Sequence, residues 1–123
     1  MTGDAMGTLG ELERAVMEAL WDADASLSAY DVQSRLEADG RTLAITTLLT
    51  VLSRLEKKGF VSSDRSARPH RYTPVSSRAE HVAELMHTVL GDASDRTAVL
   101  ERFVGGVSTE DAAILRQLLG RTG

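Results

Sequence analysis

Residues 44–59 read AITTLLTVLSRLEKKG, and this stretch decides how the rest of the chain is interpreted. On a helical period of about 3.6 residues, one face of the stretch is apolar and the opposite face is polar and basic. The apolar face carries Ile45, Leu48, Leu52 and Leu55, and the polar face carries Thr46, Thr47, Thr50, Ser53, Arg54 and Lys57. Lys57 and Lys58 suit the last turn of a helix and Gly59 suits a left-handed C-cap, so the helix should end at about residue 58.

The polar face of this predicted helix favours contact with nucleic acid. Hydroxyl groups and cations suit phosphate oxygens and base edges. Glu56 is the only acid in the stretch, and helical spacing places it nearer the apolar face. An ordinary solvated helix can have this composition, so the hypothesis of a DNA-recognition helix depends on the rest of the chain.

The charge of the chain is unevenly distributed, although its formal net charge is −4. Residues 1–40 contain two cations and nine acids, whereas residues 41–78 contain eight cations and two acids. Residues 79–123 contain four cations and seven acids. Because salt screens exposed charges beyond about 10 Å, the basic middle third matters more than the total charge for docking on phosphates.

Composition places the chain among folded proteins of one domain, or one small domain with an appendage. It has 123 residues, 42% of them hydrophobic, and no cysteine, which excludes disulfides, thiol catalysis and cysteine-based metal sites. No apolar run reaches membrane-spanning length and no signal-peptide pattern begins the chain. We therefore expect a cytoplasmic protein without membrane insertion.

Two shorter helices are predicted before the recognition helix, after a loose tail at residues 1–8. The first, at about 11–22, buries one apolar stripe that is covered at its edge by Trp21; the stripe contains Leu12, Ala15, Val16, Ala19 and Leu20. Ser28 and Asp31 form a capping-box variant that opens the second helix, in which Ala29, Val32 and Leu36 face inward and which Gly40 ends. The order is helix, turn, recognition helix.

A basic β-wing is predicted directly after the recognition helix. Residues 60–64 and 70–74 have strand character, and Pro69 lies in the loop between them. Arg65, Arg68 and Arg71 are natural phosphate contacts in such a wing. The alternative is a solvated hairpin whose arginines only protect an edge strand from aggregation.

The chain from Ser76 onward has the pattern of three short amphipathic helices. Ser77 with Glu80 caps a helix of about 78–90, the second helix ends at Gly105 and Gly106, and Ser108 with Asp111 caps the third. Helices this short bury too little surface to offset conformational entropy, so they need a partner. A second copy of the chain is the simplest partner, and we expect an interface at Val82, Leu85, Val89, Phe103, Leu115, Leu118 and Leu119.

Three segments together resemble the penicillinase-repressor family of bacterial winged-helix regulators, to which the BlaI- and MecI-type repressors belong. They are ELERAVM at 11–17 with LW at 20–21, the 44–59 stretch, and RYTP at 71–74. The resemblance extends over residues 9–119. It implies a mainly α fold with a small β-wing: a winged helix-turn-helix DNA-binding domain at 9–75 and a three-helix dimerisation region at 76–120.

The resemblance also implies a function. Repressors of this family bind palindromic operators as dimers and are released when a membrane sensor peptidase triggers cleavage before a Phe-Val pair, which here is Phe103-Val104. Arg102 replaces the asparagine usual at this bond in the best-known members. Leu49 stands where some relatives carry a basic residue, and it offers only apolar contact, for example to a thymine methyl. The absence of cysteine excludes the copper-responsive branch of the family.

Patterns typical of catalysis or of metal binding are absent from the sequence. No nucleophile motif, phosphate-binding glycine loop or carboxylate pair is found, so we expect neither enzymatic activity nor a cofactor. His81, Glu84 and His87 share one side of a predicted helix, but their three-residue steps drift around it and no second pair of ligands follows. We expect surface or dimer-facing residues here rather than a metal site.

The sequence hypothesis is therefore a dimeric winged-helix repressor of operator DNA. Thr46, Thr47, Thr50 and Arg54 would contact bases, and Lys57, Arg65, Arg68 and Arg71 would contact phosphates. Release by a membrane sensor peptidase or another protease would cut between Arg102 and Phe103. The alternatives are a winged-helix module that binds another protein and a winged-helix regulator that senses a small molecule.

Overall fold

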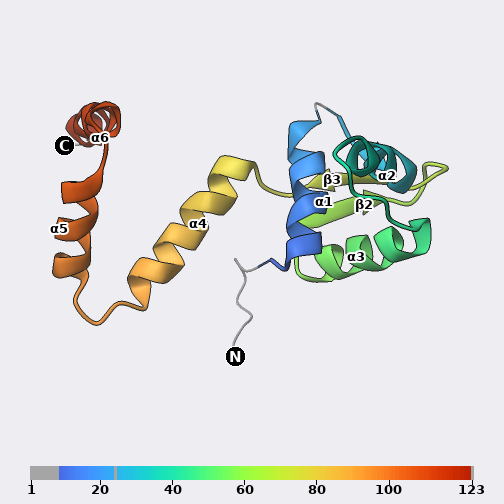
Figure 1. The fold of residues 1–123 in the computed structure, drawn as a ribbon, viewed down its shortest axis with the longest axis horizontal. Helices are drawn as coiled ribbons and strands as arrows, with labels where there is room; N and C mark the ends of the chain where they lie inside the picture. The colour runs from blue at the N-terminus through green and yellow to red at the C-terminus, as the bar shows by residue number, and fades with distance from the viewer. Residues whose placement is uncertain (1–8, 24, 123) are drawn as a thin grey trace. The chain divides into compact units, whose positions relative to one another are not determined.

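The computed structural model describes residues 9–23 and 25–122, which form two compact units divided between Leu85 and Met86 (Figure 1). The predicted tail at residues 1–8 lies outside the described residues. In chain order the elements are α1 (Glu11–Asp22), β1 (Leu27–Ser28), α2 (Ala29–Ala38), α3 (Ile45–Lys57), β2 (Val61–Asp64), β3 (Arg71–Pro74), α4 (Arg78–Gly91), α5 (Arg96–Gly106) and α6 (Thr109–Thr122). This is the predicted mainly α fold with a small antiparallel sheet.

The core of the first unit lies among α1, α2, α3 and the sheet. Its fully buried side chains include Val16, Met17, Leu20, Val32, Leu48, Leu52 and Leu55. The predicted inward stripes of the three helices are confirmed in outline, but Ile45 is only half-buried, and Met17 and Val51 are buried although neither was predicted to be. The buried face of α1 and of α3 is wider than one narrow stripe, because each of these helices packs against more than one neighbouring element.

Local signals set the ends of α2 and α3 as the sequence predicted. The Ser28 hydroxyl accepts the Asp31 amide at 3.1 Å, and the Asp31 carboxylate accepts the Ser28 amide at 3.0 Å. This second bond lowers the pKa of Asp31 below its usual value. Gly40 and Gly59 have φ of 92° and 87°, a left-handed conformation that disfavours any residue with a Cβ atom.

The sheet has three strands in the order β1-β3-β2, all antiparallel. In the hairpin, Val61 pairs with Pro74 and Asp64 pairs with Arg71, so each strand begins one residue later than predicted. Strand β1 was not predicted, because a two-residue strand leaves no alternation to detect. It pairs Leu27 with Tyr72 and thereby joins the start of α2 to the wing.

The first turn of α4 packs on the first unit through His81, which corrects the prediction that this histidine is at the surface or faces a partner chain. The imidazole is only 5% exposed, with ring centroids 5.2 Å from Trp21 and 5.5 Å from Phe60. The Trp21 indole donates to the carbonyl of Ser76 at 2.9 Å. Trp21 therefore anchors α4 and the segment between β3 and α4, rather than only covering the edge of α1.

An arginine also holds the start of α4 against α1. The Arg78 guanidinium donates to Glu18 at 2.6 and 2.9 Å and to Asp22 at 2.7 Å, and it lies over the Trp21 ring. Hydrogen bonds to Asp22 and Glu18 raise the pKa of Arg78. The beginning of α4 therefore belongs structurally with the first unit, whereas the predicted helical region begins at residue 76.

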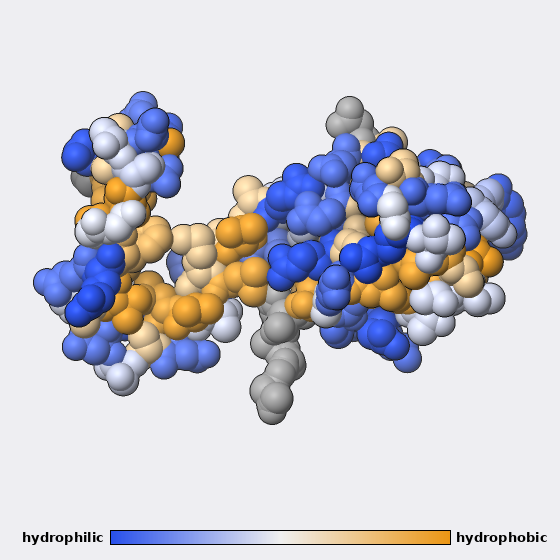
Figure 2. Space-filling model, in the orientation of Figure 1, coloured by the Kyte–Doolittle hydropathy of each residue, from blue (hydrophilic) through white to orange (hydrophobic). Residues whose placement is uncertain are grey.

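The second unit contains the end of α4, α5 and α6, and none of its described side chains from 86 to 121 is buried. The Ser108 hydroxyl accepts the Asp111 amide at 3.0 Å, as predicted, and Asp95 caps α5 by accepting the Ala98 amide at 3.1 Å. Figure 2 shows apolar residues at the surface of these helices. The large exposed ones are Met86, Val89, Val99, Leu100, Phe103, Val104, Ile114, Leu118 and Leu119.

A half-buried ion pair connects the beginning of α1 to the end of α3. The Glu13 carboxylate, 5% exposed as a residue, accepts Lys58 Nζ at 2.9 and 3.0 Å and the Gly10 amide at 3.0 Å. Burial by itself raises the pKa of Glu13, but the Gly10 amide and the Lys58 ammonium outweigh it and lower the pKa below the usual value. The ionised form is therefore favoured in the folded protein.

We predict that Glu13→Gln lowers the free energy of unfolding at pH 7 by roughly 1.5–3 kcal/mol, the range for hydrogen bonds to charged groups. Because folding lowers the pKa of Glu13, its contribution is complete above the pKa in the unfolded chain and is lost as the pH falls through the lower folded pKa. Urea unfolding at pH 7 and pH 3 measures both effects. Glu11→Gln is the control, because Glu11 is exposed and pairs with Arg41 at 3.4 Å; equal losses for the two variants at pH 7 would contradict the prediction.

Candidate nucleic-acid interface

The outer face of α3 presents hydroxyl groups and cations, while its inner face is buried. Leu48, Val51, Leu52 and Leu55 are 0–2% exposed. The exposed residues on the opposite side include Thr46, Thr47, Leu49, Thr50, Ser53, Arg54 and Lys57. Five of these, from Leu49 to Lys57, line a shallow hollow of about 450 Å³ on the helix surface. The polar face that the sequence predicted is thus a continuous accessible surface.

The Thr50 side chain has a defined hydrogen-bonding state. Its hydroxyl donates to the Thr46 carbonyl at 3.1 Å, which occupies the hydroxyl hydrogen. The lone pairs of the oxygen stay available, so Thr50 can accept from an exocyclic amine of adenine or cytosine. The Thr50 methyl group lies on the same side chain and offers an apolar contact as well.

The three cations near the end of α3 have two different roles. Lys58 is used within the fold, because it binds Glu13. Arg54 and Lys57 are exposed, and within the described residues neither forms a salt bridge. Helical spacing had placed Lys57 and not Lys58 on the polar face, but it could not reveal the partner of Lys58, which lies 45 residues earlier in the chain.

The wing is attached to α3 by a carboxylate. Glu56 accepts the Arg65 guanidinium at 2.9 Å and the Ser63 hydroxyl at 2.8 Å. Arg65, the first residue of the hairpin loop, is therefore held beside α3. Glu56 was predicted to lie near the apolar face, and its half-buried position agrees with that prediction.

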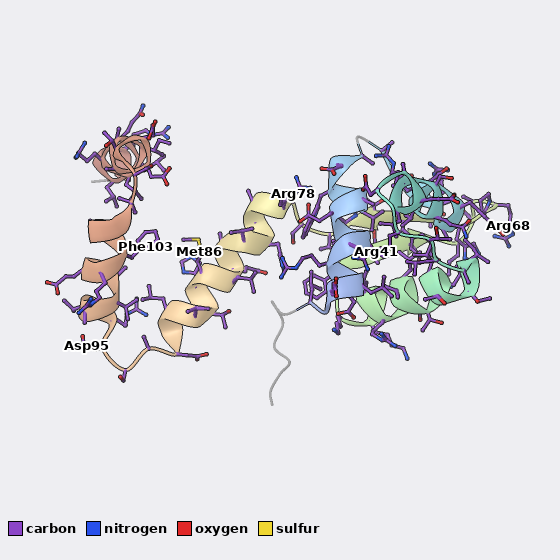
Figure 3. The ribbon with its side chains drawn as sticks, in the orientation of Figure 1. Arg41, Arg68, Arg78, Met86, Asp95 and Phe103 are labelled. Carbon is purple, nitrogen blue, oxygen red and sulfur yellow. The ribbon has the colours of Figure 1, made fainter. Side chains whose placement is uncertain are left out.

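The tip of the wing carries Arg68, which points outward from the hairpin loop (Figure 3). Its guanidinium donates to the carbonyl of Arg65 at 2.5 Å and to that of Ala67 at 3.1 Å. In the same loop, the Ser66 hydroxyl and amide donate to Asp64 and lower the pKa of Asp64. The loop is thus closed by its own polar groups while the Arg68 side chain stays exposed.

Arg71 differs from the other two wing arginines, because it is half-buried and its guanidinium contacts residues outside the hairpin. It donates to the Ser26 hydroxyl at 2.9 Å and to the Ser26 carbonyl at 2.5 Å, and it lies 3.9 Å from Asp31. These contacts hold the segment before β1 against β3. No sequence signal pairs Arg71 with a serine 45 residues away, so Arg71 was predicted to contact phosphate in the same way as Arg65 and Arg68.

The described residues contain no group of three or more histidines, cysteines or carboxylates that could hold a metal ion. None of the helices in this part of the chain combines the length and apolarity that a bilayer crossing needs.

The family match and the curated relatives of this chain agree with each other. Residues 9–121 match the family described as penicillinase repressor. Two curated proteins named transcriptional regulator BlaI, from Mycobacterium tuberculosis strains CDC 1551 / Oshkosh and ATCC 25618 / H37Rv, are 46% identical over 114 residues, covering 90% of this chain and 82% of each relative.

Among solved structures, a chain of the hsRosR-S4 complex structure aligns with a TM-score of 0.53 at 18% identity, covering 89% of this chain and 95% of that one. A chain of the hsRosR-S1 complex structure aligns with a TM-score of 0.52 at 19% identity, covering 87% and 95%. At these identities the likeness concerns the fold.

Proposed function

Since this chain belongs to the penicillinase repressor family of transcriptional regulators, which are not enzymes, we propose that it is a dimeric repressor that binds a palindromic operator through α3 and the wing. The observation that carries the proposal is the outer face of α3. It exposes threonines and Arg54 over a buried apolar face, and the basic wing adjoins it. Most acids of the first unit lie in residues 11–39 instead.

Base contacts are assigned to Thr46, Thr47, Thr50 and Arg54. Thr46, Thr47 and Thr50 lie in the first two turns of α3, the part of a recognition helix that reaches base edges in the major groove, whereas Arg54 lies in the last turn and has a longer side chain. A guanidinium can bind guanine O6 and N7 together, a contact worth about 1–3 kcal/mol of discrimination. Arg54 is therefore expected to contribute most to selectivity.

Phosphate contacts are assigned to Lys57, Arg65 and Arg68. Lys57 extends the exposed face of α3, while Arg65 and Arg68 lie along the hairpin. Arg71 is left out of this set, because it is half-buried by its contacts to Ser26 and Asp31, whereas Arg65 and Arg68 are exposed and can bind phosphate beside their contacts within the fold. Phosphate contacts position the protein without selecting a sequence.

The first test is selection of duplexes from random-sequence DNA by the purified protein at two salt concentrations. We expect an enriched palindrome with half-sites about one helical turn, 34–36 Å, apart. On that operator, Arg54→Ala should lose both affinity and selectivity, whereas Lys57→Ala should weaken all sequences alike and reduce the salt slope by about 1. Arg116→Ala, at an exposed position of α6, is the control.

Two results would contradict this assignment. An Arg54→Ala variant that keeps the affinity and selectivity of the parent protein would show that this face of α3 does not read bases. The absence of any enriched sequence, with weak binding lost in modest salt, would leave only non-specific electrostatics and favour a protein-interaction module.

Dimerisation is assigned to the helical region, because most of its large apolar side chains are exposed. Val89 is 69% exposed, Phe103 49% and Leu118 44%. Val82, Leu85, Leu115 and Leu119 complete the interface proposed from the sequence. An exposed apolar surface of this extent marks an association surface, and a two-fold dimer presents two copies of α3 to one operator.

We predict that Leu118→Asp produces monomers in sedimentation analysis, because a buried unpaired carboxylate is too costly for the interface. Gln117→Asp adds the same charge at the neighbouring exposed position of α6 and should remain dimeric. A Leu118→Asp protein that sediments as a dimer would show that the interface lies elsewhere.

Release from DNA is proposed to follow proteolysis between Arg102 and Phe103. Both residues are exposed, but the bond lies inside α5. A protease binds an extended backbone, so α5 must unwind locally before cleavage. We expect a fragment ending at Arg102 in cells exposed to the inducer, measured by intact mass; derepression with only full-length protein present would overturn this mechanism.

A further inference from the structure

A small apolar hollow lies between α2, the first turns of α3 and the wing loop. It has a volume of about 250 Å³, and its lining includes Tyr30, Ile45, Leu49, Arg68, Pro69 and His70. Figure 1 shows that the start of α3 and the loop between β2 and β3 lie at the same end of the fold. The hollow therefore adjoins the face assigned to base contacts.

Leu49 connects this hollow to the rest of the α3 surface. Its side chain lines both the hollow and the shallow surface formed with Thr50 and Arg54. It is 44% exposed, and Tyr30 on the opposite wall is 58% exposed. Neither apolar side chain is covered by the core of the first unit, so both present apolar area to whatever docks on α3.

We infer that Leu49, with Ile45 and Tyr30, forms a subsite that reads the C5-methyl group of a thymine in each operator half-site. This inference rests on the proposed function, because it requires α3 to enter the major groove. Thymine alone among the four DNA bases presents a methyl group there. A cytosine at the same place would direct its amine at apolar carbon and leave a donor without a partner.

The chemistry of the rim favours DNA as the occupant. Arg68 and His70 line the hollow, and no carboxylate does so among its lining residues. A strand whose thymine contacts Leu49 can thus bring a neighbouring phosphate toward the cation at the wing tip. Four of the residues that line the hollow, Ala29, Ile45, Leu49 and Pro69, have no side-chain donor, so this apolar part of the lining does not suit the phosphate itself.

The test removes single methyl groups from the selected operator. Each thymine of the half-site is replaced in turn by deoxyuridine, symmetrically in both halves, and binding is measured at fixed salt. At one position we expect affinity to fall about fourfold per half-site, the size expected for burial of one methyl group. With Leu49→Ala, the preference for thymine over uracil at that position should fall to about one.

Matched variants separate the subsite from general effects. Val75→Ala also truncates an exposed apolar side chain of the first unit, 60% exposed and not lining the hollow, and should keep the full preference for thymine. Tyr30→Ala removes the opposite wall and should reduce the preference without abolishing operator binding. Circular dichroism and thermal melting check that each variant is folded.

The outcomes distinguish this inference from the function on which it rests. The inference would be overturned if no thymine-to-deoxyuridine replacement lowered the affinity, or if the loss of affinity persisted in Leu49→Ala. In that case the repressor function still stands if Arg54→Ala loses selectivity for the operator. If no operator is selected at all, the proposed function fails and the thymine subsite fails with it. Sensitivity at one position that Leu49→Ala removes would establish the subsite.

Discussion

Burial of the inner face of α3 is the constraint on which the interface depends. Leu48, Val51, Leu52 and Leu55 are enclosed by α1, α2 and β2, and rotating the helix would expose them. Four such side chains contribute several kcal/mol of hydrophobic free energy, so the rotation of α3 about its axis is strongly determined. The threonines and Arg54 face outward because the leucines face inward.

Ion pairs then fix the positions of two basic residues of the first unit. Glu13 binds Lys58 and Glu56 binds Arg65, so each carboxylate holds one basic residue in a defined position. The first pair fixes the end of α3 to α1, and the second fixes the wing to α3. Arg65 stays exposed although it is paired, whereas Lys57 is exposed and forms no salt bridge within the described residues. The distribution of acids within the fold thus shapes the basic surface.

The two units differ in what stabilises them. The first has its own core and includes the start of α4, where His81 packs between two aromatic rings and Arg78 binds two carboxylates. The second exposes most of its apolar side chains and buries none of those described. A unit of that kind gains its stability from association, which is why repression by this protein is expected to depend on a second copy of the chain.

Local chemistry in the sequence was sufficient for the helices, the hairpin and the polar face of α3. Apolar periodicity, the Ser28–Asp31 capping box and Gly59 act within a few residues of one another, so they can be recognised without a fold. Tertiary structure alone decided the burial of His81, the use of Arg71 at Ser26, the pairing of Lys58 with Glu13 and the hollow beside Leu49. Each of these depends on residues far apart in sequence, and no periodicity or composition encodes which distant side chain will meet another.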